Sequence, residues 1–252
     1  MIYMDSQWRD FNTIPIFTYT GQYAILNDNN EPIISSNDNW KIKFFTSGIL
    51  TFQSLNGAKD GIDVFLVGGG GCSWNSTSYY GPGGGGGYTT TKTTTELKVG
   101  VAYEIVIGEG GIGSTANSNS SPATNGTAST AFSFVANGGT APEADRSPAG
   151  SGGSAGAPLV SSGSPHAGFI DGAGNGEYTL NSSWIAGKGQ GTTTREFGEA
   201  INTLYSTGGA ANSTTGKNGK PNTGDGGGGA NSGVGGNGGS GIVVIRNTRK
   251  ML

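Results

Sequence analysis

Aromatic side chains between glycine tracts are the residues of this sequence best suited to contact another molecule. Seven of them lie in Ser-, Asn- and Gly-rich stretches: Trp74, Tyr79, Tyr80, His166, Phe169, Tyr178 and Trp184. Tyr and Trp offer rigid amphipathic contact area, and Ser, Asn and Gly add adaptable hydrogen bonds. The sequence therefore predicts a ligand-binding surface for a carbohydrate or a protein. The alternative for Trp74 and Trp184 is a minor core that caps a glycine-rich bundle.

Catalytic chemistry is not expected of these residues. His166 is the single histidine and Cys72 the single cysteine, so neither has a second such residue with which to hold a metal ion. The stretch GPGGGG at 81–86 matches a dinucleotide-binding spacing, but YTTTKTTT, which has a strand composition, follows it instead of a helix. We expect no enzyme activity, no cofactor and no metal site.

Carboxylates leave one enzymatic alternative open. A polysaccharide hydrolase would need two carboxyl groups at a defined separation, and the candidates are Asp171, Glu177, Glu196 and Glu199. Their separation cannot be obtained from the sequence. The alternative of a structural spacer or capping protein would require inert, repetitive loops, whereas these loops are dissimilar and aromatic.

The segment GQGTTTREFGEA at 189–200 is the most charged part of the second half. We expect Arg195 to bridge Glu196 or Glu199 and to fix a turn between two parts of the fold, a pair of small energetic value. A contact between Arg195 and a receptor is the alternative.

The overall charge argues against nucleic acid as a partner. Fourteen Lys and Arg are scattered among 17 Asp and Glu, which gives a net charge of -3. No apolar stretch approaches the roughly 18 residues that span a bilayer, and the N-terminus lacks the pattern of a signal peptide. We therefore expect no membrane insertion, and a location outside a cell only as part of a larger particle.

The conventional core is predicted to be β-structure. β-Branched and aromatic runs separated by Asn, Asp and Gly turns fill residues 14–67 and return at 88–99, 102–108, 131–136 and 241–247. IDVFLV (62–67) and GIVVIR (241–246) are continuous apolar runs, which is typical of central strands buried on both faces. We expect residues 1–13 to be an N-terminal attachment segment and residues 14–252 to form one β-sandwich unit.

Glycine-rich tracts and loops at 68–87, 109–130 and 137–240 interrupt the predicted strands. Glycine has no side chain to pack, so such tracts need another source of order. Left-handed extended helices with about three residues per turn have outward-facing backbone groups that neighbouring helices can satisfy. The sequence predicts a packed bundle of polyglycine II helices, in which a side chain at Gly85 or Gly228 would force segments apart. A flexible linker is the alternative.

Several segments resemble the glycine-rich proteins of bacteriophage and prophage tail fibre tips. The likeness covers residues from about 17 to 248 and rests on DNWKIKFFTSGILTF, IDVFLVGGGG, GGGGGYTTTKT, YEIVIGEGG, GQGTTTREFGEA and GGSGIVVIRN. The resemblance implies a receptor-binding adhesin of a virion tail, whose partners are a bacterial surface glycan or protein and other tail proteins. It supplies no catalytic residue. A jelly-roll or TNF-like strand set with inserted polyglycine helices is also similar in architecture to the glycine-rich domain of anaplastic lymphoma kinase.

Overall fold

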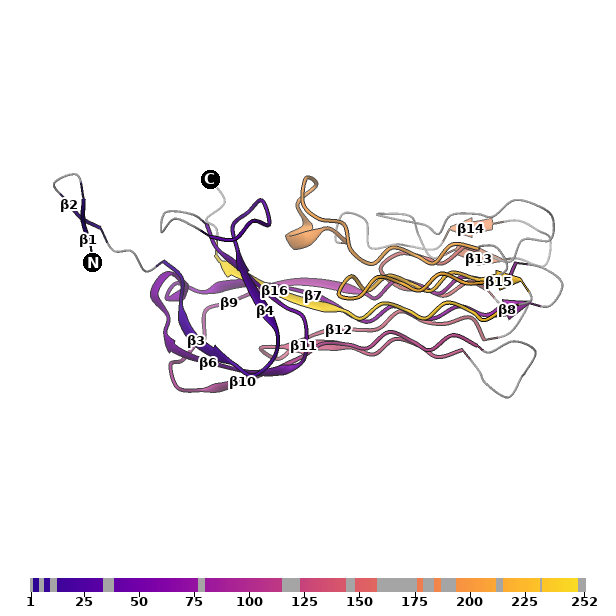
Figure 1. The fold of residues 1–252 in the computed structure, drawn as a ribbon, viewed down its shortest axis with the longest axis horizontal. Helices are drawn as coiled ribbons and strands as arrows, with labels where there is room; N and C mark the ends of the chain where they lie inside the picture. Colours follow the sequence, from indigo (N-terminus) through magenta and orange to yellow (C-terminus); the bar gives the residue numbers. More distant parts are fainter. Residues whose placement is uncertain are drawn as a thin grey trace.

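β-Branched and aromatic runs form the strands of two antiparallel five-stranded sheets that pack face to face (Figure 1). The computed structural model describes residues 2–4, 7–9, 13–33, 39–76, 80–114, 123–143, 148–157, 176–178, 184–186, 194–211, 215–231 and 233–248. The chain is mainly β, and the helical turns among these residues are 3-10 turns such as η1 (Asn56–Ala58) and η3 (Glu196–Gly198).

One sheet has the order β12-β11-β10-β6-β3 and the other the order β4-β5-β16-β7-β9. The first comprises β3 (Ile16–Tyr19), β6 (Gly48–Ser54), β10 (Ala102–Val106), β11 (Ser129–Ala131) and β12 (Phe134–Ala136). The second comprises β4 (Tyr23–Leu26), β5 (Lys41–Phe44), β7 (Ile62–Val67), β9 (Thr89–Thr94) and β16 (Ile242–Asn247). The last strand of the chain therefore lies between two strands from its first quarter.

The two continuous apolar runs are central strands, as predicted. β7 and β16 pair with each other over six residues, and β5 and β9 flank them. One face of this sheet contributes Ile62, Val64, Leu66, Val243 and Ile245 to the core between the sheets. The opposite face contributes Phe65, Val67, Ile242 and Val244 to a second cluster with Phe197 and Tyr205. Burial on both faces explains why neither strand alternates with polar residues.

Two of the predicted strands differ in the structure. The expected strand 131–136 is a hairpin, because Phe132 and Ser133 adopt left-handed backbone conformations with φ of 50° and 66° and reverse the chain between β11 and β12. The expected strand 88–99 ends at Thr94 in β9. Three short strand pairs were not predicted: β1 (Ile2–Met4) with β2 (Gln7–Arg9), β13 (Gly176–Tyr178) with β14 (Trp184–Ala186), and β8 (Asn75–Ser76) with β15 (Ala230–Asn231).

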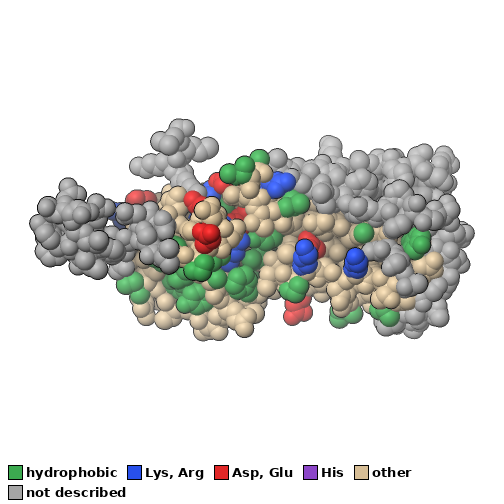
Figure 2. Space-filling model, turned by 45° about the horizontal axis from the view of Figure 1, so that its top comes forward, with side chains coloured by type: hydrophobic (Ala, Val, Ile, Leu, Met, Phe, Trp, Pro, Cys, Tyr) green, Lys and Arg blue, Asp and Glu red, His purple; other side chains and the backbone are tan. Residues whose placement is uncertain are grey.

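Extended glycine-rich segments lie side by side beyond the sandwich and form what we call the glycine bundle (Figure 1). Its main segments are 68–74, 81–87, 108–114, 123–128, 137–141, 150–157, 207–211, 216–219, 224–230 and 235–241. Figure 2 shows hydrophobic side chains gathered mainly over the sandwich, whereas the bundle surface is mostly backbone and small polar side chains. The bundle is thus held together by something other than a conventional apolar core.

Backbone hydrogen bonds with a period of three residues connect the segments of the bundle. Within residues 68–74, successive N–H groups donate to three different neighbours in turn. The N–H groups of Gly68, Gly71 and Trp74 donate to the carbonyls of Tyr88, Gly85 and Pro82, respectively. Those of Gly69 and Cys72 donate to the carbonyls of Thr127 and Thr124. Those of Gly70 and Ser73 donate to the carbonyls of Gly239 and Gly236. Segment 68–74 therefore satisfies its backbone groups on three sides, which a β-strand cannot do.

Glycine is required where these backbones touch. A Cβ at Gly84 would lie 2.1 Å from the carbonyl oxygen of Gly71, and one at Gly85 would lie 2.2 Å from that of Ser151. Gly228 differs from this expectation, since its Cβ would approach no atom closer than 3.2 Å. Gly228 is buried, but a shift of a few tenths of an ångström in its neighbours would make room for a methyl group at this position.

Candidate functional site

The end of the glycine bundle opposite the sandwich is the first candidate site. Segment 68–74 leaves β7 and runs outward, and its antiparallel partner 81–87 returns into β9, so the connection between them lies at the far end. The described chain leaves this end after Ser76, Ser114, Glu143, Ala157, Ala211 and Asn231. Described segments from distant parts of the sequence therefore reach the same end of the bundle.

Trp74 lies in a packed position close to this end. The residue is 9% exposed, and its backbone N–H donates to the carbonyl of Pro82 at 3.1 Å. Its carbonyl accepts from Ala230, whose segment extends into β15 beside β8. Trp74 is therefore mostly enclosed among the described residues.

Three of the remaining predicted aromatic residues lie within the described part of the chain. Tyr80 is half-buried where the chain re-enters the bundle. Tyr178 and Trp184 are direct cross-strand partners in the β13–β14 hairpin, whose backbone alone is described. Tyr79, His166 and Phe169 lie outside the described residues. The structure thus brings the backbones of Tyr178 and Trp184 together, a pairing that the sequence did not suggest.

A buried group of charges, which we call the charged clamp, fastens the segment 194–206 to the outer face of the sandwich. Its members are Lys41, Lys43, Asp63, Glu196, Glu199 and Arg246. Glu196 binds Lys41 at 2.7 Å and Lys43 at 2.9 Å, and it also accepts a hydrogen bond from the Tyr205 hydroxyl at 3.0 Å. The predicted link between the segment 194–206 and the sandwich is present, but the prediction that Arg195 supplies its positive charge was wrong. Arg195 donates to the carbonyl of Asn202, while the sandwich supplies the cations for both glutamates.

Electrostatics keep Glu196 ionised although its side chain is fully buried. Burial by itself would raise its pKa, but Lys43 and Lys41 outweigh that effect and hold the pKa below the ordinary value of 4.5. Burial and the neighbouring Glu196 carboxylate raise the pKa of Tyr205, so its hydroxyl remains a donor. The clamp therefore holds an ionised carboxylate between two lysines on the outer face of the sandwich.

The two candidate carboxylates of the hydrolase alternative whose side chains are described, Glu196 and Glu199, both pair with cations. Glu196 is enclosed by two lysines and Glu199 binds Arg246, whereas Asp171 and the side chain of Glu177 are outside the description. The N–H groups of the GPGGGG stretch donate to carbonyls of Ala230, Ala157, Gly227, Thr140 and Ser154. A phosphate would have to displace these bonds. Cys72 is fully buried, and burial raises its pKa to about 11.

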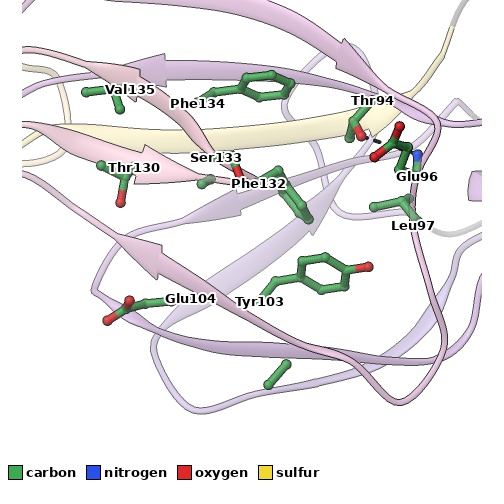
Figure 3. A pocket seen from close by; sticks show the side chains of 12 residues that line it. Thr94, Glu96, Leu97, Tyr103, Glu104, Thr130, Phe132, Ser133, Phe134 and Val135 are labelled. Atoms are coloured by element: carbon green, nitrogen blue, oxygen red, sulfur yellow. Dashed lines mark hydrogen bonds between the residues drawn. The ribbon is translucent and has the colours of Figure 1, made fainter.

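A second candidate, which we call the edge cleft, lies where the two sheets meet beside β9 and β12. It has a volume of about 550 Å³ and an aromatic wall of Tyr103, Phe132 and Phe134 (Figure 3). β11 and β12 are three residues long, so their turn stops short of the end of β10 and leaves this hollow. Sequence reasoning missed it because 131–136 was assigned to a single strand. The one available signal was the close spacing of Phe132 and Phe134.

Two further observations concern metals and membranes. No group of three or more His, Cys, Asp and Glu that could hold a metal ion occurs within the described residues. No helix in the same part of the chain is long and apolar enough to cross a bilayer.

Comparison with known proteins identifies a family. The family model for the glycine-rich domain matches residues 46–248, which include most of the sandwich and all of the glycine bundle. No curated protein is significantly similar to the chain. Because the match covers more than half of the sequence, the chain belongs to the glycine-rich domain family.

Proposed function

We propose that this chain is a non-catalytic receptor-binding module, an adhesin at the tip of a phage or prophage tail fibre that recognises a bacterial surface glycan or protein. In this proposal the sandwich is jelly-roll-like, and the bundle segments are polyglycine II helices. The period of three residues in their hydrogen bonding, with donors directed to three neighbours, supports that assignment.

One observation carries the proposal: described bundle segments from six parts of the chain run up to the end of the bundle farthest from the sandwich, at Ser76, Ser114, Glu143, Ala157, Ala211 and Asn231, while the last strand β16 lies in the sandwich (Figure 1). Backbone contacts inside the bundle tolerate almost no side chains, so sequence variation is confined to the surface and the excursions. A rigid scaffold that presents loops at one end is a common arrangement for recognition. The N-terminal residues 1–13 would attach the module to other tail proteins.

Attachment of purified protein to bacterial cells tests this proposal. The double variant Tyr79→Ala with Tyr80→Ala, and a second with Phe169→Ala and Tyr178→Ala, should weaken attachment by about 1–4 kcal/mol for each hot-spot residue, with little change in melting temperature. Tyr23→Ala is the matched control, because Tyr23 is an aromatic residue 43% exposed on the sandwich. Equal attachment by wild type and both double variants would refute the assignment of these loops.

A further inference from the structure

We infer that the edge cleft is a second binding site, separate from the far end of the bundle, and that it takes a neutral oligosaccharide. Its volume of about 550 Å³ lies within the range of small-molecule sites, roughly 300–1,000 Å³, and suits about two or three sugar units. The cleft is lined by residues of the sandwich strands and their connections (Figure 3), so its occupant does not compete with ligands at the bundle end.

Two of the three rings of the aromatic wall are in contact, and a core residue supports one of them. The rings of Tyr103 and Phe132 lie 5.1 Å apart at 46°, and Phe52 supports Tyr103 from the core at 6.0 Å. The Tyr103 hydroxyl accepts a hydrogen bond from the N–H of Lys98 at 2.7 Å. Rings in contact leave no gap in which a cation could be enclosed, but their combined surface matches the flat C–H face of a pyranose.

The polar side chains that line the cleft beside this wall are carboxylates and hydroxyl groups. Glu96 and Glu104 are exposed carboxylates at the cleft, and Thr94, Thr130 and Ser133 provide hydroxyl groups. Carboxylates accept hydrogen bonds from sugar hydroxyls and repel anionic ligands. The lining as described includes no Lys or Arg. This combination selects a neutral saccharide over an acidic one.

The backbone geometry of the cleft favours a saccharide over a peptide as its occupant. β11 pairs with β10 only at Ile105 and Val106, so the free edge of β10 is limited to Ala102–Glu104. Three residues are short for pairing with an added strand, which typically has about five or six.

The turn beside this edge gives a second argument. It uses Phe132 and Ser133 at positive φ, where Asn-Gly would fit without strain. In a chain with 50 glycines, the presence of these two side chains at this turn points to a role in contact.

Titration of the ¹⁵N-labelled full-length protein with maltotriose, cellotriose and chitotriose, followed by amide NMR shifts, tests the inference. At least one neutral trisaccharide should give saturable shifts confined to residues 94–104 and 130–135, and trigalacturonate should bind about tenfold more weakly or not at all. The double variant Glu96→Gln with Glu104→Gln should weaken binding about tenfold at unchanged melting temperature. Glu109→Gln, a change of an exposed carboxylate outside the cleft, should leave binding unchanged.

Several results would overturn the saccharide assignment. They are the absence of saturable cleft shifts with all three neutral trisaccharides at about 10 mM, tighter binding of trigalacturonate, or equal affinity of the double variant. Shifts of β10 caused by an extended Thr/Val peptide but by no saccharide would assign the cleft to peptides instead. None of these results bears on attachment through Tyr79 and Tyr80, so the two sites are tested independently.

Discussion

Gly85 has no room for a methyl group, because a Cβ there would lie 2.2 Å from the carbonyl oxygen and 2.4 Å from the carbonyl carbon of Ser151. Both are backbone atoms, so relief requires two segments to separate. We expect Gly85→Ala to lower the free energy of unfolding by about 3 kcal/mol or more, as judged by urea denaturation.

Gly228→Ala is the matched control, since the nearest atoms would lie 3.2 Å away. Its effect should stay within about 1 kcal/mol, because a small shift accommodates the methyl group and alanine restricts the unfolded chain. Equal stability of the two variants would show that Gly85 is not in close backbone contact.

Glu196 neutralises two lysines in the charged clamp, so Glu196→Gln should be costly. The change leaves Lys41 and Lys43 buried without a carboxylate, which typically costs about 3–5 kcal/mol. Glu199→Gln on the same segment should cost less than about 1 kcal/mol, because the Glu199 side chain is 40% exposed. Denaturation of both variants at pH 7 makes the comparison, and similar losses would argue against the clamp.

The contribution of Glu196 should also depend on pH. Its pKa in the folded state is lower than the ordinary 4.5, so its stabilisation is complete above about pH 4.5 and disappears as the pH falls through the folded value. The difference in unfolding free energy between wild type and Glu196→Gln should therefore shrink on acidification below pH 4.5. A difference that stays constant from pH 7 to the acid transition would contradict this account.

At the scale of elements, segment 68–74 is the centre of the glycine bundle. Its residue Cys72 can report on the packing of the segment through the rate of thiol labelling. The thiol is fully buried, and burial raises its pKa to about 11. At pH 8 a thiol reagent should label the native protein at least about 100-fold more slowly than the unfolded chain, from the thiolate fraction alone. Gly85→Ala should accelerate labelling, since the Gly71 N–H donates to the Gly85 carbonyl. Native labelling at the unfolded rate would mean that the segment is not packed.

Elements with strong local signals were predictable from the sequence. The β-branched runs of β7 and β16 and their burial on both faces followed from composition, because a strand that packs on both sides cannot alternate with polar residues. The reversal at Phe132 and Ser133 was not predictable, because neither residue favours positive φ. The edge cleft depends on that reversal and was missed with it.

The partners of Glu196 were unpredictable for a different reason. Lys41 and Lys43 alternate with Ile42 and Phe44 in β5, so they lie on the outer face of the sheet. Only the tertiary fold places a segment from 155 residues later in the chain over that face. Sequence neighbours such as Arg195 are a poor guide to ion pairs when long-range contacts dominate.

At the scale of the whole molecule, the sandwich and the bundle are joined by continuous stretches of backbone. β7, β9, β10, β11, β12 and β16 each continue directly into a bundle segment. A displacement of the bundle would therefore require movement of the strands themselves. The bundle is thus an extension of the sandwich (Figure 1). Lys59 follows η1 in the sandwich, and Tyr80 precedes Gly81, which bonds Ala230 at the other end of the bundle.

Site-specific photo-crosslinking to bacterial cells most directly tests whether the far end of the bundle contacts the receptor. A photoreactive amino acid replaces Tyr80 in one sample and the exposed Lys59 in the other, at matched stability. The proposed function predicts crosslinks to a cell-surface component from position 80 and none above background from position 59. Crosslinks from position 59 in the absence of any from position 80 would contradict it.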